Sequence, residues 1–335
     1  MSSQKICAVV SGLQCKTARI LGAVSLCLVI PGALAAGYPD RPVRWVVPST
    51  TGGGTDKVTR VIAPKLAEYL GQNIVIENRP GASGNIGAEY VSRTAPDGYT
   101  LLTVIGSHTS NAALMKKIPF DLARDFAPVS LMLTAPSMMI GHPSLPAKTV
   151  KELVALAKAR PGQLEYASGG VGSIQHMAME LFLSMTGPKM LHVPYKATYP
   201  ALMDVIAGHV PLMVIGSMSA LPQARAGRVR AYGVTSVKRM TGAPDIPTIA
   251  EQGMPGYEAV QWFGLLAPAG APREIVTKLH AGVVRVLQDP EMKKRFIDEG
   301  VETAASGSPE EFGALIRSEL AKWARVAKDA GIKAE

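Results

Sequence analysis

Short apolar runs alternate with helical stripes along most of this chain, which restricts it to a few architectures. Residues 43–47 form an apolar run, and apolar residues then recur at helical spacing from Val58 to Leu70. Two further strands are expected at 74–76 and 101–105. Strands that alternate with helices at this spacing favour right-handed βαβ units and a parallel sheet.

The same pattern restarts in the middle of the chain and predicts a second α/β lobe. We expect strands at 137–140, 164–167, 190–193, 212–215 and 229–234, and helices at 150–158, from 173 onward and at 199–207. The last part is helical, with starts at Pro272 and at a capping box beginning at Ser308. A chain of 335 residues suits two lobes, because single cores stop growing near ~250–300 residues.

The first 35 residues have the composition of an export signal. Positive residues precede an apolar run at 20–30, no acid occurs before Asp40, and Ala33-Leu34-Ala35 is a cleavage pattern. A short buried helix is the alternative. Cleavage near Ala35 would leave 300 residues, lower the net charge from +9 to +6 and remove all three cysteines. Disulfides, thiolate nucleophiles and cysteine-ligated zinc would then be excluded from the mature chain.

Composition excludes several other classes of protein. The apolar run of eleven residues is too short to cross a bilayer as a helix, which excludes a polytopic membrane protein. With 47% hydrophobic residues, the chain can offset its ordering entropy, so disorder is not the dominant state. The six histidines lack a close metal-ligand spacing, and Lys and Arg do not cluster, so we expect neither a metal site nor nucleic-acid binding.

A glycine-rich loop follows the first expected strand and forms the first candidate site. Residues 48–56 have the sequence Pro-Ser-Thr-Thr-Gly-Gly-Gly-Thr-Asp. Glycines let the backbone approach a ligand, hydroxyls donate hydrogen bonds, and a helix start presents free N–H groups, so the loop suits an anion. An ordinary turn capped by Thr55 is the alternative. Neither a Walker motif nor the dinucleotide glycine spacing is present.

A second loop of the same kind occupies residues 168–176, with the sequence Ser-Gly-Gly-Val-Gly-Ser-Ile-Gln-His. Ser173 is a natural helix N-cap, and His176 falls on the face opposite the apolar stripe. Pure capping by Ser173 and a solvated His176 are the alternatives. Two such loops in two lobes could face each other and hold one carboxylate from both sides. A nucleophile elbow is not indicated, because the G-x-S-x-G pattern is absent.

Several segments resemble the solute receptors of tripartite tricarboxylate transporters, the Bug-type extracytoplasmic binding proteins of Gram-negative bacteria. The resemblance covers essentially the whole mature chain in order, and its Glu-Asn-Arg-Pro-Gly-Ala segment at 77–82 is highly specific. The matching stretches are 38–43, 52–56, 75–87, 96–100, 125–129, 172–173, 192–196 and 262–268.

The resemblance implies a type II periplasmic-binding-protein fold, in which two α/β lobes close on a ligand between them. Lobe one would comprise 37–137 and 261–335, lobe two 138–260, with crossovers near 136–141 and 261–267. Family ligands are mostly small carboxylates: di- and tricarboxylic acids, acidic amino acids and aromatic acids. Expected partners are this carboxylate and cognate membrane transporter subunits, and the receptor is expected to be a periplasmic monomer without a cofactor.

The family's binding positions map onto both loops and onto residues that follow the third strand. Asp204, whose alternative is an ordinary solvated acid on its helix, also matches a position near the family's cleft. The implied ligand-binding residues are Ser49, Thr50, Gly53, Thr55, Asp56, Ser107, His108, Asn111, Gly170, Val171, Gly172, Ser173, His176, Tyr195 and Asp204.

Some positions depart from the family pattern. Thr50-Thr51 adds hydroxyls to the first loop, and Ala197 stands where glycine is usual. Pro211 replaces an acid, and Ile215-Gly216 replaces Phe-Asp at positions that help line the second lobe in relatives. The ligand is therefore expected to differ from the commonest ones, with Met213 and Met218 giving that wall a softer, more apolar character.

The sequence thus favours a binding protein over an enzyme. Carboxylate capture at the two loops, followed by lobe closure, predicts that Gly170→Val or Gly53→Val damages binding more than Ser173→Ala does. The rival function is an exported hydrolase using Ser173 and His176, although a triad usually brings its base from elsewhere in the chain. A receptor that reports to a two-component sensor is the third hypothesis.

Overall fold

A computed structural model describes residues 37–115 and 117–332. From Pro39 onward the chain forms one compact unit, and of the preceding residues only Gly37 and Tyr38 are described. The expected export signal with its three cysteines therefore lies outside the described residues. None of the helices within the described ranges is both long and apolar enough to cross a membrane.

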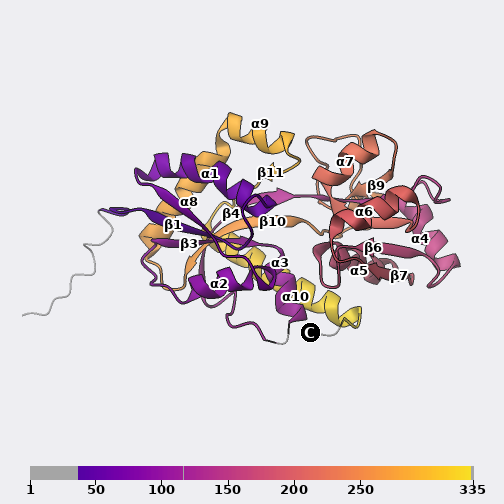
Figure 1. Cartoon of the computed structure of the whole chain (residues 1–335), viewed down its shortest axis with the longest axis horizontal. Helices are drawn as coiled ribbons and strands as arrows, with labels where there is room; N and C mark the ends of the chain where they lie inside the picture. Colours follow the sequence, from indigo (N-terminus) through magenta and orange to yellow (C-terminus); the bar gives the residue numbers. More distant parts are fainter. Residues whose placement is uncertain (1–36, 116, 333–335) are drawn as a thin grey trace, which may run out of the picture. The chain divides into compact units, whose positions relative to one another are not determined.

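Lobe one is built around a six-stranded sheet of order β11-β4-β10-β3-β1-β2 (Figure 1). β1 pairs in parallel with β2 and β3, whereas β10 runs antiparallel to both β3 and β4. Its strands are β1 (Val43–Val47), β2 (Ile74–Asn78), β3 (Thr100–Ile105), β4 (Phe126–Ala135), β10 (Gln261–Pro268) and β11 (Glu302–Thr303). Its helices are α1 (Gly54–Leu70), α2 (Asn85–Ser92), α3 (Ser107–Leu114), α8 (Arg273–Gln288), α9 (Pro290–Asp298) and α10 (Pro309–Asp329), with the 3-10 turn η1 (Ala82–Gly84) before α2.

Lobe two is built around a five-stranded sheet of order β7-β6-β8-β5-β9. β6 is parallel to β7 and β8, and β5 is antiparallel to β8 and β9. Its strands are β5 (Ser137–Gly141), β6 (Glu165–Ser168), β7 (Leu191–Pro194), β8 (Leu212–Gly216) and β9 (Arg230–Val234). Its helices are α4 (Val150–Ala159), α5 (Ile174–Thr186), α6 (Thr198–Ala207) and α7 (Ser217–Arg225), with the 3-10 turn η2 (Ala250–Gln252) after β9.

Both sheets are mixed, which corrects the expectation of purely parallel pairing. β5 follows β4 after the single residue Pro136, so the chain enters lobe two directly and not through a crossover helix. The chain returns to lobe one through β10, which pairs antiparallel with β3 and β4. Two α/β lobes are thus present, and the boundaries expected from the sequence stay a prediction.

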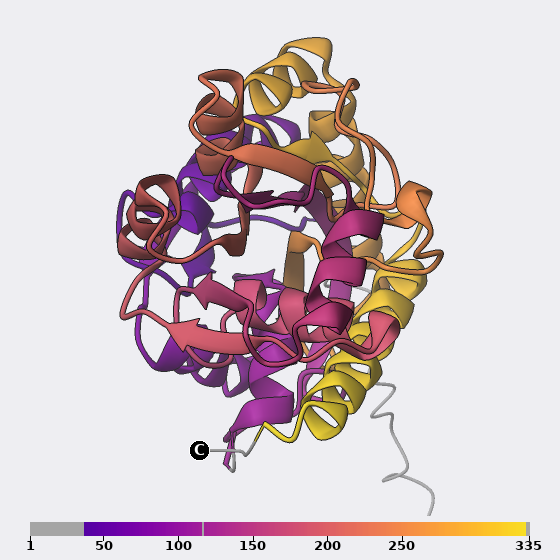
Figure 2. The same ribbon diagram turned by 90° about the vertical axis from the view of Figure 1, so that its right-hand side faces the viewer.

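The C-terminal helix α10 contributes to the cores of both lobes. Phe312 and Ile316, near its start, pack with Trp262 of β10 in a lobe-one core cluster. Trp323 and Val326, two to four turns later, belong to a cluster otherwise made largely of lobe-two residues. Figure 2 shows this yellow helix running beside the helices that it contacts, α3 and α5. One amphipathic helix therefore links the two lobes on the side of the crossing strand β10.

Candidate functional site

A cavity of about 1050 Å³ opens where loops from the two lobes meet. It lies at the carboxyl ends of the parallel strands β1, β2, β3, β6 and β8, which is where open α/β sheets bind ligands. Every described residue that lines it is uncharged. Its hydrogen-bonding side chains are Ser49, Ser83, Ser107, Asn111, Ser137, Ser173, Gln175, Thr198, Ser217, Ser219 and Gln261.

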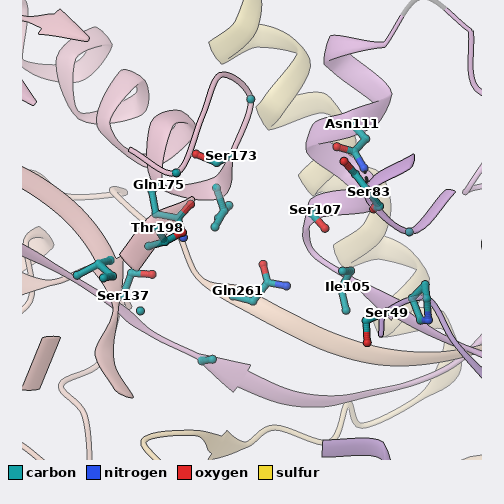
Figure 3. Close-up of a pocket in the computed structure, with 18 of the residues that line it drawn as sticks. Ser49, Ser83, Ile105, Ser107, Asn111, Ser137, Ser173, Gln175, Thr198 and Gln261 are labelled. Atoms are coloured by element: carbon teal, nitrogen blue, oxygen red, sulfur yellow. Dashed lines mark hydrogen bonds between the residues drawn. The ribbon is translucent and has the colours of Figure 1, made fainter. Parts of the chain in front are cut away.

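Polar groups from the two lobes face each other across this cavity (Figure 3). Ser49, Ser107 and Asn111 lie on the lobe-one side. Ser173 and Thr198 lie opposite on lobe two, while Gln261 of the crossing strand β10 lies between the two groups. The Oε1 atom of Gln261 is buried and has no hydrogen-bond partner within the described residues. A ligand in the cavity would therefore meet neutral donors and acceptors from both sides.

The first glycine loop contributes only its start to the cavity. Ser49 lines it, whereas Thr50, Gly53 and Thr55 do not. The helix that follows begins at Gly54 without a side-chain cap, so the alternative of a turn capped by Thr55 is wrong.

Asp56 is buried and bonded within the protein. Its carboxylate accepts the amide proton of Gly52 at 2.8 Å and the Nε proton of Arg60 at 2.9 Å. Asn78 donates both to this carboxylate and to the carbonyl oxygen of Ser49. Asp56 and Asn78 therefore fix the shape of the loop from behind the cavity wall.

The segments after β2 and β3 form the rest of the lobe-one wall. Asn111 lines the cavity and donates to the carbonyl oxygen of Ser83 at 3.2 Å. Ala82 and Ser83 both have positive φ angles, of 46° and 56°, which non-glycine residues rarely adopt. Such strained residues concentrate at functional sites. His108, in contrast, is buried beneath the wall, and this burial lowers its pKa.

The second glycine loop lines the cavity through Gly169, Val171, Gly172 and Ser173. Most of its amide protons are already used within the loop. The Gly170 amide donates to the hydroxyl of Ser168, and the Ser173 amide donates to the carbonyl oxygen of Gly170. Ser173 caps α5, as predicted, by accepting the amide proton of His176. Its hydroxyl proton remains available to a ligand, so this loop offers hydroxyl donation more than a row of free amides.

His176 is 4% exposed, so the alternative of a solvated side chain is wrong; it does not line the cavity, and its contact with a ligand stays a prediction. Its Nδ1 atom accepts the amide proton of Gly172 at 3.1 Å. That lone pair is therefore not directed at Ser173, and no ring nitrogen of His176 bonds the Ser173 hydroxyl among the described residues. The arrangement disfavours the hydrolase hypothesis, because the serine lacks an aligned base.

Tyr195 and Asp204 do not line the cavity. The Tyr195 hydroxyl donates to Asp204 at 2.5 Å; burial and this neighbouring carboxylate raise the pKa of Tyr195 to about 12. The hydrogen bond from Tyr195 in turn lowers the pKa of Asp204. The backbone amide of Tyr195 donates to Ser168, so this pair borders the second loop from outside.

Sequence reasoning missed several lining residues. Ser83 lies within the matched family stretch 75–87, for which no binding role was predicted, and Gln261 directly precedes the matched stretch 262–268. The other missed polar residues are Ser137, Gln175, Thr198, Ser217 and Ser219. Of the positions that depart from the family, Ile215, Gly216 and Met218 line the cavity, whereas Met213 is buried in the lobe-two core. A polar residue at the start of an otherwise apolar strand is the signal that could have identified Gln261.

The described residues contain no group of three or more His, Cys, Asp or Glu side chains arranged for a metal ion. The cavity lining consists instead of amides, hydroxyls and apolar groups, which suit an organic solute.

The family profile, the related sequences and the solved structures that resemble this chain all indicate the same family. The profile of the tripartite tricarboxylate transporter family receptor matches residues 58–332. BugT of Bordetella pertussis is 34% identical over 94% of this chain and 98% of its own length. Rpa4515 of R. palustris, solved with adipate, is 39% identical with a TM-score of 0.74 and covers 89% of this chain and 100% of that one. MatC of Rhodopseudomonas palustris, solved with malate, is 33% identical with a TM-score of 0.69, covering 86% and 99%.

Proposed function

This chain belongs to the tripartite tricarboxylate transporter family of receptors, and from that premise we propose that it captures a small carboxylate in the cavity between its lobes. The observation that carries the proposal is a large cavity lined from both lobes by hydroxyl and amide groups. Two relatives of the same fold are solved with adipate and with malate, which are both small carboxylates.

Carboxylate binding does not require a cationic side chain here. Ser107 and Ser173 can donate hydroxyl protons, and Asn111 can donate an amide proton, to carboxylate oxygens from opposite walls. Hydrogen bonds to a charged group contribute about 1.5–3 kcal/mol each, so a few of them can replace lost hydration. The apolar lining residues, among them Val171 and Met218, would contact the carbon skeleton.

Receptors of this family include periplasmic binding proteins. The export pattern of residues 1–35 supports a periplasmic location for this chain, with cleavage near Ala35. We infer that the loaded receptor delivers its ligand to the membrane subunits of a tripartite tricarboxylate-type transporter and acts as a monomer.

A thermal-shift screen tests the proposed ligand class. The mature protein is heated with malate, adipate, glutamate and nicotinate, and with adipamide as an uncharged analogue of adipate. A specific ligand at 100 times its Kd raises the free energy of unfolding by about 2.7 kcal/mol, which is readily seen as a higher Tm.

We expect at least one acid to raise Tm and adipamide to leave it unchanged. Titration calorimetry of the best acid should then show one site, and the acid should be recovered unchanged after incubation. Stabilisation by no acid, or equal stabilisation by adipamide, would contradict carboxylate capture. Turnover of the acid would favour the hydrolase hypothesis.

A further inference from the structure

Three aromatic rings are stacked directly beneath the second glycine loop. Tyr166 of β6 and His192 of β7 are register partners in the sheet, and their ring centroids are 5.0 Å apart. His176 of α5 stacks on His192 with a centroid distance of 3.9 Å and an interplanar angle of 10°. Tyr166 and His176 are both buried. The stack therefore joins the two strands and the helix that carry the loop.

Two hydrogen-bonded paths connect this stack to the loop. His176 Nδ1 accepts the amide proton of Gly172 at 3.1 Å. His192 Nε2 lies 2.7 Å from the Ser168 hydroxyl, which accepts the amide proton of Gly170 at 3.1 Å. The two paths are thus directed at Gly170 and Gly172, on either side of Val171. They hold the part of the loop that lines the cavity.

The contact with Gly172 requires one protonation state of His176. An amide N–H can donate only to a ring nitrogen without a proton, so Nδ1 must be unprotonated and Nε2 carries the proton. The Nε2 atom lies 3.8 Å from the carboxylate of Glu180, which also accepts a hydrogen bond from the Tyr166 hydroxyl. Burial and the neighbouring His192 lower the pKa of His176 to about 3, which keeps the ring neutral at pH 7.

The loop needs such anchors because its own backbone is permissive. Gly170 and Gly172 have φ angles of 127° and 76°, which glycine adopts readily and other residues do not. A glycine-rich loop without anchors would populate many conformations, and a ligand would have to order them on binding. Fixing two amides beforehand removes part of that entropic cost.

We propose that the stack of Tyr166, His192 and His176 positions the second glycine loop for ligand capture, with His176 Nδ1 as the acceptor that fixes Gly172. The part of this inference that concerns ligand affinity rests on the proposed function. The part that concerns the conformation of the loop does not. His176 is accordingly a positioning residue that does not itself line the cavity.

A matched pair of variants tests the acceptor role of His176. In His176→Asn the side-chain Oδ1 atom can take the place of Nδ1, whereas His176→Leu keeps bulk but offers no acceptor. The first readout is hydrogen exchange of the Gly172 amide, measured by NMR at pH 7 without ligand. We expect exchange at least 10-fold faster than wild type in His176→Leu and within 3-fold of wild type in His176→Asn.

The second readout is the Kd for adipate, and for malate in parallel, by titration calorimetry. We expect His176→Leu to weaken binding about 10-fold and His176→Asn to retain wild-type affinity within 3-fold. Ser168→Ala is a milder variant that serves if His176→Leu does not fold. It removes the acceptor of Gly170 and should speed exchange of that amide while leaving Gly172 protected.

Each outcome decides a separate part of the inference. Unchanged Gly172 exchange in His176→Leu, or equal exchange in the Leu and Asn variants, would overturn the anchoring of the loop by His176. Faster exchange with wild-type affinity would overturn its role in capture. If no carboxylate binds the wild-type protein, the proposed function fails and the role in capture fails with it, while the exchange data still decide the anchoring.

Discussion

The Asp56 carboxylate accepts the amide proton of Gly52 at 2.8 Å from within the first turn of the following helix, although only 1% of Asp56 is exposed. Burial by itself would raise the pKa of this carboxyl. The hydrogen bonds from Arg60, Gly52 and Asn78 outweigh that effect and lower the pKa. The residue implied by the family resemblance as a ligand contact thus holds the first loop in place, and a direct contact with ligand stays a prediction.

Asp56→Ala should destabilise the protein by about 1–3 kcal/mol, because the Gly52 amide and the Asn78 side chain lose a buried acceptor. Asp56→Asn should lower the free energy of unfolding by less, since its Oδ1 atom can still accept one of these protons. Urea unfolding of both variants measures the difference. Asp298→Asn serves as the control, because its ion pair with Lys294 is exposed and should change stability by less than about 0.5 kcal/mol. Wild-type stability in Asp56→Ala would contradict the anchoring role.

The positions of most strands and helices could be predicted from local patterns, but the pairing of strands could not. All residues of β1 (43–47) except Arg44 are buried, as expected of a short strand in the core. The antiparallel placement of β10 depends on partners more than 120 residues away, which no local period encodes. The two-lobe packing of α10 was missed for the same reason, since one apolar stripe can serve two cores.

The site was predictable where loop chemistry follows from sequence, as at Ser49 and Ser173, which both line the cavity. It was not predictable where a side chain depends on tertiary stacking. His176 lies off the apolar stripe, which left a solvated side chain as the alternative to ligand contact, yet it is buried against His192. Ser83 lines the cavity in a conformation with a positive φ angle, and a serine in the sequence gives no sign of such a conformation.

Gly170→Ala should weaken carboxylate binding substantially, whereas Gly54→Ala should not. Gly170 has a φ angle of 127°, so an alanine there costs about 1–3 kcal/mol of strain or forces the loop into another conformation. Gly54 begins α1, and a Cβ atom there has nothing within 4 Å. Titration with adipate measures both variants, and Gly170→Val should weaken binding more than Ser173→Ala. Normal binding by the Gly170 variants would show that the loop conformation is not required.

The structure gives less support to the prediction that Gly53→Val damages ligand binding. Gly53 has an ordinary φ angle of −68° and does not line the cavity. A Cβ atom there would lie 3.2 Å from the carbonyl oxygen of Thr50, so a modest local shift is expected. We therefore expect Gly53→Ala to change affinity less than Gly170→Ala does.

Stability should fall as the pH falls from 7 to 5, in part through His176. Its pKa is about 3 in the folded protein, against about 6.5 when unfolded, so the unfolded chain binds more protons throughout this range. The free energy of unfolding should therefore drop by about 2 kcal/mol from His176 alone between pH 7 and pH 5. Burial also lowers the pKa of His192, to about 4, which acts in the same direction.

Urea unfolding at pH 7 and pH 5 isolates this contribution when wild type is compared with His176→Asn. Between pH 7 and pH 5 the free energy of unfolding of the variant should fall by about 2 kcal/mol less than that of wild type. Glu180 has a raised pKa, which acts in the opposite direction, but it is present in both proteins. Equal pH dependence of the two proteins would mean that His176 is not held neutral by burial.

Glu319 of α10 should be among the charged residues most sensitive to substitution, because its buried carboxylate connects α10 to the strand β10. Only 6% exposed, it accepts the indole protons of Trp262 at 3.3 Å and Trp323 at 2.9 Å and pairs with Lys322. Trp262 lies on the crossing strand β10 and belongs to the lobe-one core cluster, whereas Trp323 belongs to the cluster made largely of lobe-two residues. The Glu319 carboxylate therefore accepts a hydrogen bond from one tryptophan of each cluster.

Glu319→Leu should lower the free energy of unfolding by about 3–5 kcal/mol, because it leaves two indole donors and a partly buried ammonium group without their acceptor. Glu319→Gln keeps one carbonyl acceptor and should lose less. Since α10 packs on both lobes, we also expect Glu319→Gln to alter the Kd for adipate, although the residue does not line the cavity. Urea unfolding and titration calorimetry measure the two effects, with Glu310→Gln at the exposed start of α10 as the control. A Glu319→Leu variant as stable as this control would show that the buried carboxylate contributes nothing to the junction.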